Sequence, residues 1–386
     1  MMPKIKKLPL GDVATFKSGG TPNKSKADYW DGHFPWVSAK DLKTPIITDS
    51  IDRLTKKGFE AANVAPENSL LILVRGMTLF KDVPVCLAGR AVAFNQDIKA
   101  LLVSEELTPQ YLMFYLQSQK NKLLDLVDSA GHGTGRLNTV SLKAFPVLVP
   151  SLPEQHAIAV LLSTWNLAIE KAERLIAAKE KLYIFLLSRL ISNSSFSHVH
   201  IRDFTAEVSR RNVGVLIDRV LSVTNRNGFI LPEDQFARRV ASSDLSNYKI
   251  VTSGQYAYNP SRINVGSIAR LDNWDTGVLS PMYVVFKLDE TRANSDFFLH
   301  WLESHEAKQR ISKSAQGSVR ETVSFGDLGA IPFPLPSIEE QKQIAAILTT
   351  ARQEIDLLKK QAAAYRRQKR GLMQRLLTGE WRVRVG

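Results

Sequence analysis

Arginine and asparagine side chains recur in loops of this sequence that also contain Gly, Ser or Asn. A guanidinium presents five N–H donors in a flat fork, and an amide presents a donor beside an acceptor, so both can hold a planar or anionic group through paired hydrogen bonds. The loop residues that could do this are Arg75, Arg136, Asn259, Arg262, Asn264 and Arg320. Lysines in polar segments could add contacts to anionic oxygens, and these are Lys24, Lys26, Lys40 and Lys81. The chemistry that these residue types support is non-covalent binding.

Side chains that would carry catalysis do not gather in the sequence. His198 and His200 have no nearby Cys or acidic cluster that would complete a four-ligand metal site. Neither a Walker A motif nor a Gly-x-Gly-x-x-Gly motif after a strand is present. Residues 259–262, Asn-Pro-Ser-Arg, differ from the Asn-Pro-Pro-Tyr motif of adenine methyltransferases because Arg262 replaces the aromatic ring that stacks on a flipped base. We therefore expect no catalytic residue, no metal and no cofactor.

The elements that must position the loops are two long helices that begin with the same motif. The first opens with Pro-Ser-Leu-Pro-Glu-Gln at residues 150–155, and the second opens with Pro-Ser-Ile-Glu-Glu-Gln at residues 336–341, 186 positions later (336 minus 150). Ser followed three residues later by Glu has the spacing of a capping box, in which the hydroxyl and the carboxylate satisfy free N–H groups at a helix start. We predict this box at Ser151 and at Ser337.

An apolar stripe with alternating spacing of four and three residues follows each motif. It starts at Ile158 in the first segment and at Ile344 in the second, and Lys179 and Lys369 interrupt it once in each. Such a stripe faces a partner along a coiled coil, and a lysine within it reduces stability while fixing the register. A helix of about 40 residues is roughly 60 Å long and cannot bury the stripe alone. The two helices are therefore predicted to pair with each other.

Two related globular modules precede the two helices. Residues 111–118 align with residues 297–304 at the same offset, and each module ends as helix, Gly/Ser loop with an Arg, Pro-bounded strand and long helix. The front halves differ, because the second module lacks the Gly-Gly-Thr-Pro and Pro-Trp elements of the first. The fold class is therefore predicted to be α+β, with two pseudo-repeated mixed α/β domains separated by the two helices. The expected divisions are a first domain at 1–150, a helix at 151–192, a second domain at 193–336, a helix at 337–379 and a tail with a short strand at 380–386.

Smaller features are also predicted. Thr108 and Pro109 should cap a helix that runs to about Leu126. Residues 131–136 should form a mobile turn, although Gly at alternate positions can also form an anion-binding nest. Trp30 and Trp36 should belong to a core.

Composition restricts the partners. Lys and Arg number 51 against 38 acidic residues, which gives a formal charge of +13 and favours polyanions. The N-terminus is not expected to be a signal peptide, and the sequence contains no uncharged run of 18 residues that could span a membrane. The single cysteine, Cys86, excludes an internal disulfide. Together these features predict a cytoplasmic protein.

The motifs together resemble those of the specificity (S) subunits of Type I restriction-modification systems. The resemblance covers nearly the whole chain and rests on the doubled Pro-Ser-x-x-Glu-Gln motif and on residues 10–12, 18–22, 95–97, 258–267 and 377–379. It implies a phage-defence protein without catalysis, in which two target-recognition domains each read one half of a split double-stranded DNA sequence. It also implies that the two long helices pair as an antiparallel coiled coil. By the same resemblance, this coiled coil docks two methyltransferase subunits, and restriction subunits can join them. From the residues alone, an assembly scaffold that does not read DNA and a nuclease with an unrecognised site remain as alternatives.

Overall fold

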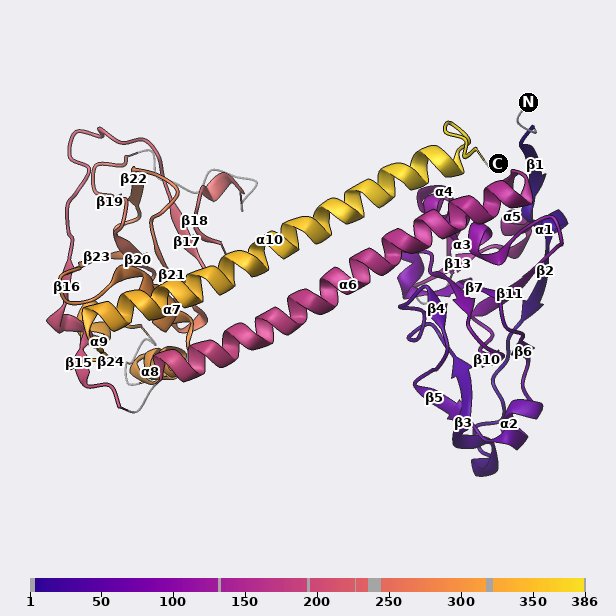
Figure 1. The fold of residues 1–386 in the computed structure, drawn as a ribbon, viewed down its shortest axis with the longest axis horizontal. Coiled ribbons are helices and arrows are strands. Elements are labelled where there is room, and N and C mark those ends of the chain that lie inside the picture. Colours follow the sequence, from indigo (N-terminus) through magenta and orange to yellow (C-terminus); the bar gives the residue numbers. More distant parts are fainter. Residues whose placement is uncertain are drawn as a thin grey trace. The chain divides into compact units, whose positions relative to one another are not determined.

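The computed structural model describes residues 4–130, 133–192, 195–225, 227–234, 244–316 and 322–384. The chain forms two compact units (Figure 1). Unit 1 comprises residues 1–172 and 361–386, and unit 2 comprises residues 173–360. Each unit therefore contains one globular module and one half of each long helix.

The long helices are α6 (Leu152–Ile191) and α10 (Ile338–Leu377), each of 40 residues. In unit 1 the first half of α6 packs on the second half of α10, where the ring centroids of Trp165 and Tyr365 lie 5.6 Å apart. In unit 2 the second half of α6 packs on the first half of α10, where Lys179 Nζ lies 2.7 Å from Glu354 Oε1. The helices are thus antiparallel, and the predicted mixed α/β fold with an antiparallel helix pair is confirmed.

Unit 1 is built on a five-stranded sheet with the order β2-β11-β7-β9-β4. Its strands are β2 (Ala14–Ser18), β11 (Ile98–Val103), β7 (Leu70–Leu73), β9 (Val85–Ala88) and β4 (Ile46–Ile47). A second sheet has the order β5-β3-β10-β6, with β5 (Asp52–Leu54), β3 (Trp30–Val37), β10 (Val92–Phe94) and β6 (Val64–Ala65). The third contains β12 (Val127–Ala130), β13 (Thr134–Leu137) and β8 (Arg75–Gly76), and a fourth pairs β1 (Lys6–Pro9) with β14 (Pro146–Val149). The helices of the module are α1 (Leu10–Val13), α2 (Lys56–Glu60), α3 (Pro109–Ser118), α4 (Lys120–Leu124) and α5 (Thr139–Lys143).

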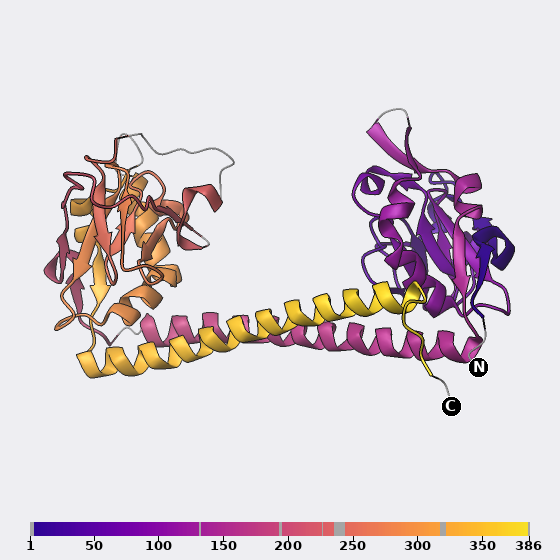
Figure 2. The same cartoon turned by 90° about the horizontal axis from the view of Figure 1, so that it is seen from above.

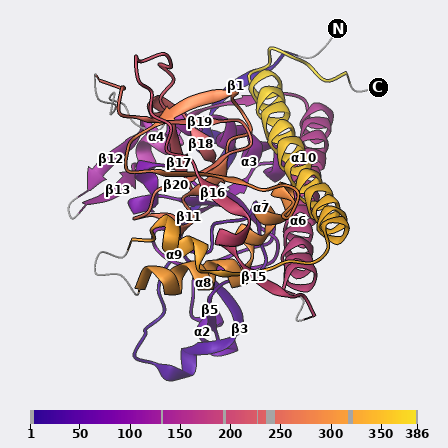
Figure 3. The ribbon, with the colours of Figure 1, turned by 90° about the vertical axis from the view of Figure 1, so that its left-hand side faces the viewer.

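Unit 2 repeats the central part of this plan. Its main sheet has the order β16-β23-β20-β21, with β16 (Thr205–Glu207), β23 (Val284–Leu288), β20 (Tyr256–Tyr258) and β21 (Ile268–Arg270). Three two-stranded sheets complete it: β15 (His198–His200) with β24 (Pro332–Pro334), β17 (Ser222–Thr224) with β18 (Gly228–Ile230), and β19 (Lys249–Thr252) with β22 (Thr276–Leu279). The helices are α7 (Ser295–Glu303), α8 (His305–Gln316) and α9 (Phe325–Gly329). In Figure 3, α7 lies between the long helices and strands β16 and β20 of the same unit. The four strands β16-β23-β20-β21 thus follow the same order as β2-β11-β7-β9 of unit 1, whereas the remaining sheets of the two front halves differ.

A buried glutamine attaches each module to its helix. Gln155 is fully buried, donates from Nε2 to the carbonyl oxygens of Pro150 (2.9 Å) and Glu106 (2.8 Å), and accepts from the N–H of Thr108 at 2.8 Å. Gln341 makes the same three bonds in unit 2, to residues that follow at the same offset: Pro336, Arg292 and Asn294. The glutamine that ends the repeated motif thus fixes a loop against the start of the long helix. Gln155 holds the loop before α3, and Gln341 holds the loop before α7.

The two helix starts differ in their capping. Ser337 and Glu340 form the predicted capping box, with Glu340 Oε2 accepting from the Ser337 N–H at 3.0 Å and Ser337 Oγ accepting from the Glu340 N–H at 3.3 Å. The box predicted for Ser151 and Glu154 is wrong. Glu154 is buried and instead receives two hydrogen bonds from the Arg382 guanidinium, at 2.7 and 2.8 Å. The tail from residue 380 to residue 384, which was predicted to contain a strand, has no regular secondary structure.

The helix predicted to run to Leu126 divides at Gln119 into α3 and α4. Thr108 is the N-cap residue of α3 and Pro109 its first residue, as predicted, but the Thr108 hydroxyl makes no capping bond and is buried without a described partner. The backbone N–H of Thr108 is held by Gln155, so this loop is fixed through its backbone.

Candidate nucleic-acid interface

Arg75 and Arg136, which are 61 positions apart in the sequence (136 minus 75), are neighbours in unit 1. Strand β13 pairs antiparallel with β8, and Arg136 is the register partner of Arg75. On its other side, β13 pairs with β12, where Asp128 is the register partner of Arg136. Arg75 and Arg136 are both exposed, and neither guanidinium forms an ion pair with a described residue. Because like charges directly opposite on neighbouring strands destabilise a sheet, this arginine pair would be stabilised by an anionic or hydrogen-bond-accepting ligand.

Two glycines shape this part of unit 1. Gly76 has φ +145°, a conformation that L side chains rarely adopt, and it begins the 3-10 helix η2 (Met77–Phe80). Gly135 lies in β13, where an added Cβ would come within 2.9 Å of the Leu79 Cβ. The absence of a side chain at Gly135 therefore lets buried Leu79 hold η2 against β13. The predicted anion-binding nest is not formed by Gly135, which is part of the strand, while Gly131 and His132 lie outside the described residues.

The hairpin of β12 and β13 projects from the side of unit 1 opposite its helix halves (Figure 2). Lys81, which directly follows η2, is exposed. Arg75, Arg136 and Lys81 thus belong to one basic segment, which we call the η2 platform: strands β8 and β13, helix η2 and Lys81. Its geometry depends on the pairing of strands distant in sequence.

The other predicted lysines belong to a different part of unit 1. Lys24 and Lys26 are exposed in the loop between β2 and β3, and Lys26 Nζ lies 5.0 Å from the ring centroid of Tyr29. Lys40 follows β3 and pairs with Asp52 at 2.8 Å, and this hydrogen bond raises the pKa of Lys40. Unit 1 also contains a small hydrophobic cluster with Trp36 and, at its edge, Trp30. The prediction that both tryptophans belong to a core is confirmed.

In unit 2, Asn259, Arg262 and Asn264 lie in one loop between β20 and β21. The Asn259 side-chain oxygen accepts from the N–H of Ser261 at 3.0 Å, so this amide stabilises the turn itself. Arg262 and Asn264 are exposed at the start and in the middle of η6 (Ile263–Val265), which ends at Gly266 with φ +91°. Arg320 lies outside the described residues.

A hydrogen bond at matching positions shows that this loop is the counterpart of the η2 platform. The Pro260 carbonyl accepts from the N–H of Val323 at 3.1 Å, and the Val74 carbonyl accepts from the N–H of Leu137 at 2.9 Å. Both residues of the second pair precede those of the first by 186 positions. Each loop also connects equivalent strands, β20 to β21 and β7 to β9. The two units therefore carry different residues on one common frame.

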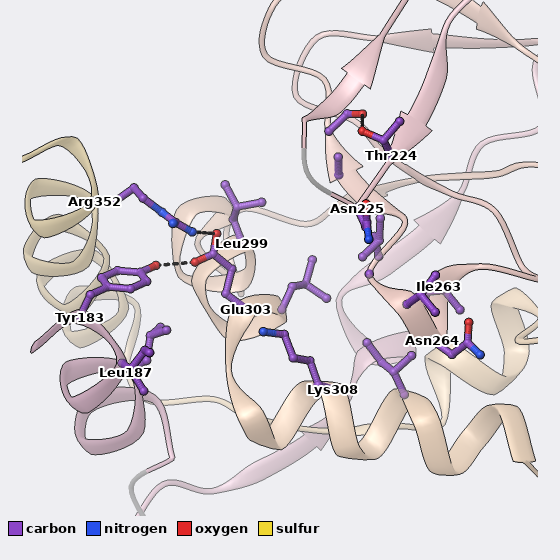
Figure 4. A pocket seen from close by; sticks show the side chains of 18 of the residues that line it. Tyr183, Leu187, Thr224, Asn225, Ile263, Asn264, Leu299, Glu303, Lys308 and Arg352 are labelled. Atoms are coloured by element: carbon purple, nitrogen blue, oxygen red, sulfur yellow. Dashed lines mark hydrogen bonds and ion pairs between the residues drawn. The ribbon is translucent and has the colours of Figure 1, made fainter. Parts of the chain in front are cut away.

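Unit 2 also contains a cleft of about 710 Å³ between α6, α8 and the η6 loop (Figure 4). Part of its polar wall is a hydrogen-bonded network centred on Glu303. Glu303 accepts from the Tyr183 hydroxyl at 2.6 Å and from the Arg352 guanidinium. His300 bonds through Nδ1 to Tyr183 at 3.0 Å and through Nε2 to Thr349 at 2.9 Å. Burial lowers the pKa of His300, so the ring is neutral and ties α7 to both long helices.

The described residues contain no group of three or more His, Cys, Asp or Glu side chains that could hold a metal ion. His198, for which a metal role was considered, has Nε2 3.9 Å from a carboxylate oxygen of Glu306. Cys86 is buried in β9, and burial raises the pKa of its thiol to about 12. Across the part of the chain that the structure describes, no helix has the length and apolar character needed to span a membrane.

The fold and these loops define a two-module protein whose modules share a frame and differ in their exposed polar residues. A family model described as the Type I restriction modification DNA specificity domain matches residues 2–180 and 244–364. The chain belongs to this family, and the predicted family is confirmed.

Relatives and solved structures agree with this assignment. The chain is 28% identical over 190 residues to the Type I restriction enzyme EcoR124I/EcoR124II specificity subunit of Escherichia coli, an alignment that covers 47% of each chain. It thus spans about half the length of that relative. It is 20% identical over 405 residues to the Type I restriction enzyme MjaVIII specificity subunit of Methanocaldococcus jannaschii, covering 97% of this chain and 92% of the relative. The fold matches the crystal structure of a Type-I restriction-modification system S subunit from M. genitalium with a TM-score of 0.63 and 16% identity, over 97% of this chain and 96% of the other.

Proposed function

We propose that the chain is the DNA sequence-recognition subunit of a Type I restriction-modification complex and that its two units each read one half of a bipartite target. The observation that carries this proposal is the pair of equivalent loops. One carries Arg75, beside Arg136 of the paired strand β13, and the other carries Arg262 and Asn264, on the same strand-loop-strand frame. A common frame with different hydrogen-bonding groups suits two modules that read different base sequences.

The residue types match the chemistry of base edges. Arginine can donate two hydrogen bonds to guanine in the major groove, and asparagine can pair with adenine. Lys24, Lys26, Lys40 and Lys81 are proposed phosphate contacts, which give affinity without sequence information. Asn259 and Arg320 complete the set of proposed contacts. The excess of positive charge supports the same partner, since each neutralised phosphate releases counterions.

The long helices are the proposed docking surface for two methyltransferase subunits and, through them, restriction subunits. Large apolar side chains are exposed on α6 in both units, and exposed apolar residues that gather on one element mark interaction surfaces. They are Leu152, Val160, Leu161 and Leu167 in unit 1, and Leu175, Leu182, Ile184 and Phe185 in unit 2. In this proposal the partners perform all catalysis on DNA in the cytoplasm. The division at residues 150, 192, 336 and 379 is proposed as the boundary between reading and docking parts.

Purification of the chain with its natural partners, followed by base-resolution mapping of methylated adenines in the same cells, tests this function. We expect a split target and co-purifying methyltransferase subunits. The isolated chain should not cut DNA in the presence of magnesium, whereas a nuclease would. An assembled complex that shows no sequence preference at any salt concentration would favour a scaffold instead and would contradict the proposal.

A further inference from the structure

Large apolar side chains accompany the proposed polar readers in both units. On the η2 platform, Met77 is 74% exposed and Phe80 is 51% exposed, while Leu79 between them is fully buried. In the η6 loop of unit 2, Val265 directly follows Asn264 and is 60% exposed. Met282, 62% exposed, lies with its sulfur 3.9 Å from the Asn259 amide nitrogen.

The surroundings of these side chains favour nucleic acid over protein as the partner. The platform that carries Met77 and Phe80 also carries Arg75, Arg136 and Lys81, with Asp128 as the acidic residue in register. A thioether or phenyl group gains nothing from a phosphate, because phosphate oxygens require hydrogen-bond donors or cations. Apolar groups beside arginines can instead contact the methyl group of thymine or the faces of the base pairs.

We propose that Met77 and Phe80 in unit 1, and Val265 and Met282 in unit 2, contact the apolar surfaces of bases and contribute to sequence discrimination. This inference rests on the proposed function and adds specificity residues to it. Exposed apolar residues recur at the equivalent loops of the two modules, as Met77 and Phe80 in unit 1 and Val265 in unit 2. Met282, between β22 and β23, adjoins the second loop through its contact with Asn259. This distinguishes these residues from single exposed residues elsewhere, such as Val140 in α5.

The test measures binding of the assembled complex to a duplex that carries the mapped target and to a random duplex, over a series of salt concentrations. We expect Met77→Ser to lower affinity for the target about tenfold, to leave binding to the random duplex unchanged, and to leave the salt dependence unchanged. Lys81→Gln should weaken binding to both duplexes and reduce the salt slope by about 1. Met77→Leu should retain affinity, and Val140→Ser, matched in exposure at 76%, should bind like the unaltered chain.

Two further experiments distinguish contact with a thymine methyl group from insertion between bases. Replacement of thymine by deoxyuridine in the half-target should cause the same loss as Met77→Ser, without adding to it, if the methyl group is the contact. A fluorescent base analogue at the contacted step should brighten on binding if the side chain unstacks the bases, and less so with Met77→Ser. Either result supports the inference.

Equal binding by Met77→Ser, Phe80→Ser and Val140→Ser, alongside weakened binding by Lys81→Gln, would overturn this inference and leave the proposed function standing. Loss of a co-purifying subunit with unchanged DNA affinity per complex would also overturn it, because the apolar residues would then face a protein. If Arg75→Gln and Lys81→Gln also bind normally, the proposed function itself fails.

Discussion

The modules of the two units contact the long helices through different side chains at equivalent positions. In unit 1, Lys369 of α10 lies with Nζ 5.7 Å from the ring centroid of Phe114 in α3, and burial lowers the pKa of this lysine. In unit 2 the equivalent positions, 186 residues away in each case, hold Tyr183 of α6 and His300 of α7, which are hydrogen-bonded at 3.0 Å. The backbone contacts made by Gln155 and Gln341 are the same in both units. The two units therefore share their backbone frame, whereas the side chains that pack their modules against the long helices differ.

The buried glutamines that both units share should have the largest effect on stability. Gln155→Leu and Gln341→Leu each remove three hydrogen bonds at a fully buried site while roughly preserving volume. Each should reduce stability by about 3 kcal/mol, because the backbone groups are left unsatisfied. Hydrogen exchange should show the loss in unit 1 for Gln155→Leu and in unit 2 for Gln341→Leu. If only one substitution is destabilising, the two attachments are not equivalent.

Glu154 and Glu340, the glutamates of the two repeated motifs, should differ in how much they contribute to stability. Glu154→Gln should cost about 2 kcal/mol, because it removes the charge from a buried carboxylate that accepts two hydrogen bonds from the Arg382 guanidinium. Glu340→Gln should cost less, since Glu340 is exposed and contributes only to a capping box. Calorimetric unfolding compares the two variants, and Arg382→Gln serves as the control, because it should add little to Glu154→Gln. Equal losses for the two glutamates would contradict the structural difference.

The His300 network predicts a pH dependence restricted to unit 2. Because burial holds the pKa of His300 below its ordinary value of about 6.5, the unfolded chain binds a proton more readily than the folded chain as pH falls below that value. The stabilisation is therefore present above about pH 6.5 and is lost as pH falls through the lowered pKa. His300→Phe, which introduces the residue found in unit 1, should flatten this part of the stability profile. The same slope in the variant and the unaltered chain would exclude His300 as its source.

The smallest expected effect concerns the lysine in the helix stripe. Lys369→Met should stabilise unit 1 by about 0.5 kcal/mol, because it removes a partly buried charge while keeping the aliphatic stem. The equivalent change in unit 2, Tyr183→Met, should instead destabilise, since Glu303 and His300 each lose a partner. Thermal melting measures both variants. Stabilisation by Tyr183→Met would show that its network contributes nothing to stability.

The features set by local pattern could be predicted from the sequence. The apolar period of the helices and the positions of their starts follow from spacing that repeats along the chain, and the structure confirms them. Their antiparallel direction was implied by the family resemblance rather than by the spacing, and the structure confirms it too. The positions of Asn259, Arg262 and Asn264 in one loop also follow from their closeness in sequence.

Features that depend on distant contacts could not be predicted. Glu154 has the spacing of a capping box, but it pairs with Arg382, which lies 228 positions further along the chain. The adjacency of Arg75 and Arg136 requires the pairing of β8 with β13, which neither segment encodes alone. The sequence shows Gln155 as part of a repeated motif but does not predict its role. Its three hydrogen-bond partners lie in a loop and at a helix start that only folding brings together. The exposure of Met77 likewise depends on the fit of Leu79 beside Gly135.

The claim that each unit reads its own half of a target is tested most directly by mapping methylated adenines at base resolution in cells that carry variant chains. Arg75→Gln combined with Arg136→Gln should relax or change the sequence preference in one half of the target and leave the other half intact. Arg262→Gln should do the reverse. A change in both halves from either variant, or an unchanged methylation pattern in both, would contradict the account.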